Sequence, residues 1–273
     1  MTIGEAIRAA ATGLAATSDT ARLDAELLMA HALGLTRSDM LLRAMRDPEP
    51  HGFAALVARR AAHEPVAYIT GCAEFYGLTL AVTPATLIPR GDSETLIAAA
   101  LERVGRHGRA IDLGTGSGAL LCALLAECPR WEGVGIDASA EALVVASANA
   151  SRLGLAHRSA WHRRDWRLSG WASDLGTFDL VLCNPPYVEA DAALDAQVRD
   201  YEPGSALFSG PEGLDDYRML LPQLRGLMTP QAVAVLEIGA SQADPVRAMA
   251  QAAGFAVTLR RDLAGRARAL ILD

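Results

Sequence analysis

The sequence predicts an α/β protein in which a doubly wound parallel sheet follows a small helical domain. From residue 109 onward, short apolar runs alternate with amphipathic stretches of helical period, and this alternation indicates parallel strands joined by helices on both faces of one sheet. Residues 1–66 have helical periodicity alone, and residues 67–83 combine aromatic and β-branched residues with glycines. We therefore expect a helical N-terminal domain over 1–66, a β-hairpin linker over 67–89 and an α/β domain over 90–273.

Helix signals fill the N-terminal domain. Leu23, Leu27 and Ala30 recur at i, i+4 and i+7, which predicts one apolar helix face. Thr36 is placed to cap a short following helix, and the stretch 51–64 stops at Pro65, as helices do before a proline. These features predict helices and no strand in this domain.

Helices and strands alternate in the larger domain. A helix near 95–103 follows the hairpin, and further helices are expected over 119–127, 140–153 and 245–253. The strands are predicted at the apolar runs 110–114, 133–137, 178–183, 232–239, 255–259 and 268–273. Ligands of such sheets bind at the carboxyl ends of the strands, so the loops that follow these runs are where a site is expected.

The composition is that of an ordinary globular protein. Of its 273 residues, 51% are hydrophobic and 21% are charged, and the net charge is −7 at pH 7. No apolar run reaches the roughly 18 residues of a membrane span, so we expect a cytoplasmic protein without membrane contact. The acidic balance argues against direct nucleic-acid binding, because neutralising phosphates requires clustered cations.

The cysteines do not indicate a metal site. Cys72, Cys122, Cys128 and Cys183 include no C-x-x-C pair, and no histidine cluster has metal-ligand spacing. We expect free buried thiols and no bound metal. Cys183 directly precedes a polar turn, but a catalytic thiol would need a partner histidine, which the sequence does not identify.

A glycine-rich loop joins the first strand of the sheet to its helix. Gly114, Gly116 and Gly118 stand at this junction, where glycine permits a tight turn and close approach of a ligand to a helix N-terminus. Asp137 ends the next strand, 19 residues after Gly118, where a carboxylate can accept hydrogen bonds from both ribose hydroxyls. The pattern indicates a nucleotide or nucleoside ligand, with a purely structural turn as the alternative.

The residues around this loop bear on the identity of the ligand. Gly114, Gly116 and Ala119 also satisfy the dinucleotide pattern G-x-G-x-x-G/A, so a nicotinamide enzyme remains an alternative. Asp112, however, stands just before the first glycine, where its carboxylate would repel a pyrophosphate and suit the cationic amino group of a methionine moiety. Gly118 further tightens the loop. The sequence therefore favours S-adenosylmethionine.

A rigid polar turn, Asn184-Pro185-Pro186-Tyr187, ends an apolar strand. Asparagine-proline turns often close strands, but beside a nucleoside-binding loop these residues suit the binding of a planar nitrogen. The side-chain oxygen of Asn184 and the carbonyl of Pro185 can accept both N–H hydrogens and steer the lone pair toward a methyl group. The prolines fix φ near about −65° and hold that carbonyl in place. Tyr187 would stack on the flat acceptor and exclude water.

The energetics of this turn favour alignment over activation. Two hydrogen bonds of about 0.5–1.5 kcal/mol net each cannot break amide conjugation, which the rotation barrier of about 18–20 kcal/mol measures. Orientation of nitrogen, methyl carbon and sulfonium can supply about 7–11 kcal/mol. No strong general base is needed, because alkylation acidifies the nitrogen and water can take the proton. The turn thus predicts methylation of a planar nitrogen without identifying the molecule that carries it.

Together these motifs resemble a known family. NPPY with DLGTGSG is similar to class I S-adenosylmethionine methyltransferases that modify a planar nitrogen. RRAAHEPVAYITGCAEFYGLTLAVTPATLIPR, DYEPGSAL, LEIG and RDLAGRARAL resemble the release factor glutamine methyltransferase family, PrmC or HemK, from about residue 20 to the C-terminus. The resemblance implies a Rossmann-like catalytic domain with a helical domain that recognises the substrate. It also implies methylation of the side-chain N5 of the glutamine in the Gly-Gly-Gln motif of class 1 peptide chain release factors, which modulates translation termination.

The resemblance also implies roles for individual residues. It assigns the S-adenosyl-L-methionine site to the glycine loop, the ribose acid and an aromatic residue near adenine, which are Gly114, Thr115, Gly116, Ser117, Gly118, Asp137 and Trp166. It assigns binding and catalysis at the acceptor glutamine to Asn184, Pro185, Pro186 and Tyr187, with Asn184 also beside the cofactor. Taken alone, Trp166 would be interpreted as a core aromatic residue.

One segment departs from the family pattern. The family has P-R-P-x-T-E where this chain has Pro89-Arg90-Gly91-Asp92-Ser93-Glu94. Gly91 loosens a helix start that proline would stiffen, although Ser93 can still cap. Two other functions remain alternatives: amino methylation of adenine or cytosine in nucleic acid, and a non-catalytic adaptor that binds the cofactor.

Overall fold

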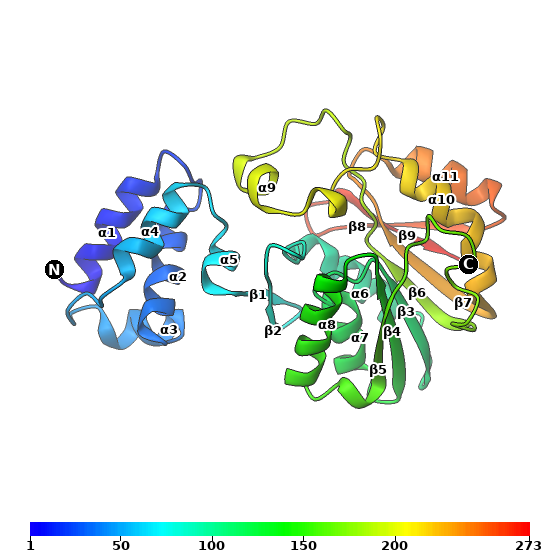
Figure 1. Ribbon diagram of the computed structural model, residues 1–273, viewed down its shortest axis with the longest axis horizontal. Coiled ribbons are helices and arrows are strands. Elements are labelled where there is room, and N and C mark those ends of the chain that lie inside the picture. The colour runs from blue at the N-terminus through cyan, green and yellow to red at the C-terminus, as the bar shows by residue number, and fades with distance from the viewer. The chain divides into compact units, whose positions relative to one another are not determined.

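The computed structural model describes residues 1–273, which form two compact units (Figure 1). The helical unit comprises Met1–Cys72 and Leu194–Tyr201, and the sheet unit comprises Ala73–Ala193 and Glu202–Asp273. None of the helices has the length and hydropathy that crossing a bilayer requires. The domain boundaries after residues 66 and 89 stay predictions.

The helical unit contains seven short or medium helices: α1 (Ile3–Leu14), α2 (Ala21–Leu33), α3 (Arg37–Asp39), the π-helical η1 (Met40–Ala44), α4 (Phe53–Ala61), α5 (Val66–Thr70) and α9 (Ala196–Tyr201). A capping box between Thr2 and Glu5 begins α1. Thr36 caps α3 through the backbone N–H of Asp39, as predicted. These caps satisfy N–H groups that a helix start leaves without intrahelical partners.

The predicted apolar face of α2 is correct for Ala30, which is 4% exposed, and wrong for Leu23. Leu23 is 41% exposed, whereas Leu28 and Met29 are fully buried. The reason is electrostatic, because the carboxylate of Asp24 faces inward and forms a buried ion pair with Arg60 at 2.6 Å. A buried, paired carboxylate on this helix turns a different set of apolar residues toward the core than the leucine spacing indicates.

A two-stranded hairpin follows, formed by β1 (Cys72–Phe75) and β2 (Leu78–Ala81). It is shorter than predicted, because α5 occupies 66–70 and ends at Gly71, whose φ of 76° stops the helix. Tyr76 and Gly77 both have positive φ, as a two-residue hairpin turn requires. The Tyr76 N–H donates to Glu94 Oε1 at 2.8 Å. Glu94 therefore fixes the hairpin turn against the segment that departs from the family pattern.

The sheet unit is built on seven strands, and the predicted α/β architecture is confirmed. The strands lie in the order β5-β4-β3-β6-β7-β9-β8. They are β3 (Gly108–Leu113), β4 (Trp131–Asp137), β5 (Ser159–Arg163), β6 (Phe178–Cys183), β7 (Met228–Glu237), β8 (Val257–Arg261) and β9 (Ala267–Leu272). All pairs from β5 to β7 are parallel, and only β9 runs antiparallel to both of its neighbours. The sheet is therefore mixed, not purely parallel as predicted.

Helices cover both faces of this sheet (Figure 1). On one face pack α6 (Glu94–Leu101), α7 (Ala119–Glu127) and α8 (Ala140–Arg152), and on the other pack α10 (Asp215–Leu224) and α11 (Ala243–Ala252). Single-turn 3₁₀ helices are η2 (Gly91–Ser93), η3 (Ala156–Arg158), η4 (Gly204–Ala206) and η5 (Arg225–Leu227). Successive residues of the central strands point to opposite faces of the sheet. In β6, Leu180 packs in the core under α6 and α7, and Val181 packs in the core under α10 and α11. Burial on both faces explains the continuous apolar runs in the sequence.

The order of strands creates a switch point beside β3. This strand lies between β4 and β6, with Leu113 paired to Ile136 on one side and to Cys183 on the other. The chain therefore leaves three neighbouring strands at the same carboxyl edge, through Gly114, Asp137 and Asn184. This is the place where open α/β sheets bind ligands.

Candidate active site

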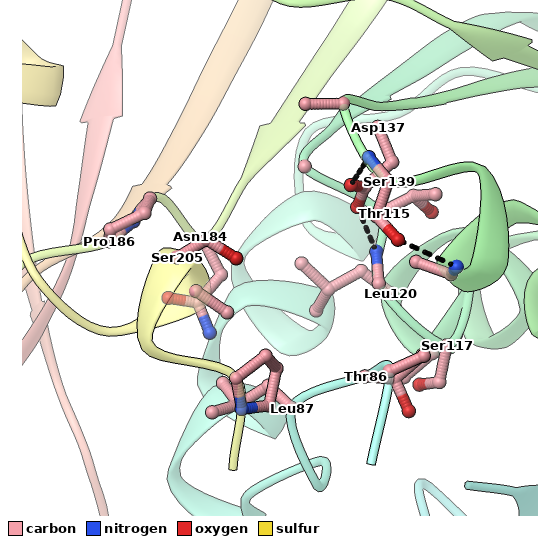
Figure 2. A pocket seen from close by; sticks show the side chains of 18 of the residues that line it. Thr86, Leu87, Thr115, Ser117, Leu120, Asp137, Ser139, Asn184, Pro186 and Ser205 are labelled. Atoms are coloured by element: carbon pink, nitrogen blue, oxygen red, sulfur yellow. Dashed lines mark hydrogen bonds between the residues drawn. The ribbon is translucent and has the colours of Figure 1, made fainter. Parts of the chain in front are cut away.

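A pocket opens at this edge of the sheet unit (Figure 2). Eight of the predicted site residues line it: Gly114, Thr115, Gly116, Ser117, Asp137, Trp166, Asn184 and Pro186. Figure 2 shows Asp137 and Ser139 on one side and Asn184, Pro186 and Ser205 on the other. Gly118, Pro185 and Tyr187 do not line the pocket. The fold thus brings the glycine loop and the polar turn into one cavity.

The glycine loop has the backbone that its sequence requires. Gly114, Gly116 and Gly118 have φ of 72°, 53° and 79°, a region that other residues rarely adopt. A Cβ on Gly114 would lie 3.0 Å from the ring of Trp166, and one on Gly118 would lie 3.1 Å from Ala146. Gly118 therefore serves the packing of α7 against α8, while Gly116 faces the open pocket.

Asp137 fits the ribose of a nucleoside. Its Oδ2 accepts the Gly116 N–H and its Oδ1 accepts the Ser139 N–H, both at 2.9 Å. A carboxylate has about four acceptor positions, so two remain for a pair of ribose hydroxyls. Burial raises the pKa of Asp137, and the backbone hydrogen bonds oppose this by stabilising the charged form. The residue is thus held rigidly, with acceptor capacity toward the pocket.

Asp112 does not contact the pocket as the sequence predicted. Its side chain is 1% exposed and lies beneath the loop, where Oδ2 accepts the Thr115 hydroxyl at 2.5 Å. Burial raises its pKa to about 7, and the nearby charge of Asp137 adds to the effect. Oδ1 is buried without a hydrogen-bond partner. The contact of Asp112 with the site is therefore indirect and runs through Thr115.

Trp166 forms part of the pocket wall next to the glycine loop. It is 9% exposed, and its indole N–H donates to Asp216 Oδ1 at 2.9 Å. Because Gly114 has no side chain, the indole ring approaches the loop backbone closely. This geometry offers a flat apolar surface on which an adenine ring can stack.

The Asn184-Pro185-Pro186-Tyr187 turn is held at its exit. The N–H groups of Tyr187 and Val188 both donate to the Leu207 carbonyl, at 3.1 and 2.8 Å. The Tyr187 carbonyl accepts from Gln242 Nε2 at 3.0 Å. These bonds leave the Asn184 side chain, which lines the pocket, as an available acceptor.

Tyr187 points its hydroxyl into a buried polar network instead of toward the pocket. It donates to Glu237 Oε1 at 3.1 Å, and Glu237 at the end of β7 is 1% exposed. Arg268 lies 3.9 Å from the same oxygen and donates to Asp92 Oδ2 at 2.9 Å. Burial raises the pKa of both Tyr187 and Glu237, with Arg268 opposing the rise at Glu237. The network fixes the aromatic ring at the end of the turn.

Sequence reasoning missed several polar residues of the pocket. Arg90 lines it and pairs with Glu202, whose other oxygen accepts the Ile88 N–H at 3.1 Å. Asp165 and Ser139 also line it, and each stands two residues after the end of a strand, β5 and β4 respectively. The signal for Asp165 was hidden, because the preceding strand β5 is only half-buried and has no apolar run. The segment directly before Gly91 is therefore bound to Glu202 through the Arg90 side chain and the Ile88 backbone.

The structure gives Cys183 a packing role. It is fully buried, and burial with neighbouring carboxylates raises its thiol pKa well above the usual value. A thiol that stays protonated is a poor nucleophile. All four cysteines are free. No group of three or more histidine, cysteine, aspartate and glutamate side chains has an arrangement that could hold a metal ion.

Known proteins resemble this chain in sequence and in fold. Residues 5–71 match the family model of the PrmC N-terminal domain, and residues 91–200 match that of the methyltransferase small domain. A release factor glutamine methyltransferase of Rhodospirillum rubrum is 41% identical over 257 residues, which cover 92% of this chain and 78% of the relative. Another, from Cereibacter sphaeroides, is 41% identical and covers 98% of this chain and 97% of the relative. The chain belongs to the release factor glutamine methyltransferase family.

The family membership agrees with the fold and with the pocket. A crystal structure of a methyltransferase from Pyrococcus furiosus superposes with a TM-score of 0.52 at 18% identity, covering 79% of this chain and 95% of that one. The family models and the two relatives confirm the resemblance stated from the motifs. The family is that of S-adenosylmethionine-dependent methyltransferases, and the free acceptor positions of Asp137 and the wall formed by Trp166 fit this cofactor.

Proposed function

We propose that this chain transfers a methyl group from S-adenosyl-L-methionine to the side-chain N5 of the glutamine in the Gly-Gly-Gln motif of class 1 peptide chain release factors, and so modulates translation termination. The observation that carries the proposal is the position of the Asn-Pro-Pro-Tyr turn. Asn184 follows β6 directly beside Gly114, so that a planar amide at the turn lies next to the cofactor loop.

The turn would hold the acceptor amide. The Asn184 side-chain oxygen would accept one N–H group, and Pro186 closes that side of the pocket. The Pro185 carbonyl is proposed as the second acceptor, although Pro185 does not itself line the pocket. Tyr187 does not line the pocket, so its proposed part is to fix the turn through the bond from its hydroxyl to Glu237. Two such hydrogen bonds orient the nitrogen, and orientation can supply about 7–11 kcal/mol of the barrier reduction.

The opposite side of the pocket would hold the cofactor. When bound, S-adenosylmethionine supplies an activated methyl group attached to a sulfonium. Asp137 accepts the ribose hydroxyls, Trp166 packs against the adenine ring, and the backbone of Gly114–Gly118 lets the ligand approach closely. The acceptors proposed for the amide, Asn184 and Pro185, are neutral, and no general base is needed there, because alkylation acidifies the nitrogen and water can take the proton.

We further propose that the helical domain, over 1–66, contributes to recognition of the release factor. The PrmC N-terminal domain model covers this segment almost completely, at 5–71, in a family named for this protein substrate. We propose no membrane contact and no direct nucleic-acid contact, in line with the net charge of −7.

One assay tests the reaction. The purified chain is incubated with methyl-labelled cofactor and, in parallel, with a release factor, the same factor with its loop glutamine replaced, and DNA. The proposal predicts label on the intact factor alone. Label on DNA, or equal label on the replaced factor, would show another acceptor, and absence of label from every arm would favour an adaptor.

A further inference from the structure

Asp216, at the start of α10, is a buried carboxylate that does not line the pocket yet holds one of its walls. Its side chain is 2% exposed. Oδ1 accepts the Trp166 indole N–H at 2.9 Å and an Arg167 N–H at 3.0 Å. Trp166 and Arg167 both line the pocket. The Arg167 guanidinium also donates to Oδ2 at 3.2 Å, so the position of this wall depends on the Asp216 carboxylate.

The other oxygen of Asp216 holds a different segment. Oδ2 accepts the Ser209 hydroxyl at 2.8 Å, and the Asp216 N–H donates back to Ser209 Oγ at the same distance. Ser209 is itself 2% exposed. This reciprocal pair is out of solvent, so neither bond can be replaced by water without opening the core.

Backbone hydrogen bonds connect the segment that contains Ser209 to the Asn-Pro-Pro-Tyr turn. Its N–H donates to the Val188 carbonyl at 2.9 Å, and two residues earlier the Leu207 carbonyl accepts the N–H groups of Tyr187 and Val188. The segment 207–209 is thus paired to the exit of the turn. Together with the reciprocal pair, these bonds connect Asp216 to the backbone that bears the proposed acceptor site.

We propose that Asp216 is a positioning residue that fixes the cofactor wall and the acceptor turn relative to each other. The inference rests on the proposed function, in which rate depends on aligning a nitrogen with a methyl carbon. Asp216 touches neither reactant. It acts through Trp166 on the cofactor side and through Ser209 on the acceptor side, so removing it misaligns both.

Each connection can be removed separately. Trp166→Phe keeps an aromatic ring but loses the indole N–H, and we expect a several-fold rise in the Kd for S-adenosylmethionine with a smaller change in kcat. Ser209→Ala loses only the hydroxyl, and we expect kcat for the release factor to fall several-fold while the Kd stays unchanged. Asp216→Ala should raise the Kd and lower kcat by at least tenfold. Asp216→Asn retains an acceptor for Trp166, so it should restore the Kd more than kcat.

A double variant and a stability control distinguish positioning from general support of the fold. Asp216→Ala combined with Ser209→Ala should lower kcat by clearly less than the product of the two single losses, because both remove the bond from the Ser209 hydroxyl to Asp216 Oδ2 and only the bond from the backbone N–H of residue 216 is left to lose. Arg158→Met is the control, since Arg158 donates to the carbonyls of Leu125, Cys128 and Trp131 and none of these residues lines the pocket. It should lower the melting temperature with kcat and Kd unchanged.

Several outcomes would overturn the proposal. These are unchanged kcat and Kd in Asp216→Ala, additive losses in the double variant, or equal losses in an Arg158→Met protein of the same melting temperature. If Asp216→Ala does not fold, Ser209→Ala and Trp166→Phe decide: the proposal fails unless the first lowers kcat and the second raises the Kd. Absence of release factor methylation by the unaltered chain would instead refute the proposed function, and the effects on cofactor Kd would still test the connection to Trp166.

Discussion

Replacing Gly116 by alanine separates backbone strain from loss of cofactor space. Gly116 has a φ of 53°, and a Cβ built there has no neighbour within 4 Å, so no protein atom needs to move. The left-handed conformation costs a residue with a side chain about 1–2 kcal/mol. Because Gly116 lines the pocket, the added methyl group also takes space beside the loop that the cofactor requires. We expect the unfolding free energy to fall by about 1–2 kcal/mol and the Kd for S-adenosylmethionine to rise at least about tenfold, which is roughly 1.4 kcal/mol.

Gly154→Ala is the matched control. Gly154 has a φ of 72°, also has open space around a Cβ, and lies beyond α8 outside the pocket. It should lose the same unfolding free energy while binding the cofactor normally. Urea unfolding measures the first quantity, and calorimetric titration with the cofactor measures the second. Equal cofactor affinities in the two variants would refute the placement of the cofactor against Gly116.

Three further predictions concern the turn and the carboxylates around it. Asn184→Ala should lower kcat at least about tenfold with little change in cofactor Kd, since a lost hydrogen bond of roughly 0.5–1.5 kcal/mol adds to lost alignment; equal losses in both would mean that Asn184 mainly holds the cofactor. Burial raises the pKa of Asp112 from 3.8 to about 7, so the folded state binds this proton more tightly than the unfolded state and stability falls as pH rises through that range. The unfolding free energy of Asp112→Asn, measured in urea, should therefore rise relative to that of the parent between pH 4 and 8, by up to roughly 4 kcal/mol. A difference in unfolding free energy that does not change with pH would contradict the assignment. Tyr187→Phe leaves Glu237 Oε1 without its donor and should cost about 1–3 kcal/mol of unfolding free energy; a thermal melt identical to that of the parent would show that this bond contributes nothing.

The part of the fold that was predictable is the part governed by periodicity. The helix over 119–127 was predicted with the bounds that α7 has, and the strands β3, β6 and β7 were recognised because burial on both faces makes much of their length apolar. The edge strand β5 has the same alternation of half-buried and exposed residues as the edge strand β8, but it lacks an apolar run like the one that made 255–259 recognisable. The direction of β9 also has no sequence signal.

The candidate site was predictable where chemistry is local. Glycines that need positive φ and an aspartate that follows a strand mark the cofactor side, and the Asn-Pro-Pro-Tyr turn marks the acceptor side. What sequence could not provide is pairing over long separations. Glu237 meets Tyr187 across 50 residues and Asp216 meets Trp166 across the same separation, and both are carboxylates that composition alone would place on the surface.

The most direct test of the function is to locate the methyl group. A class 1 release factor is incubated with the chain and S-adenosylmethionine, digested, and sequenced by tandem mass spectrometry. The account predicts one added methyl group on the side-chain nitrogen of the Gly-Gly-Gln glutamine, and methylation at least about tenfold slower when Asn184→Ala replaces the parent under the same single-turnover conditions. A methyl group on any other residue, or an unmodified loop after complete reaction of the cofactor, would contradict it.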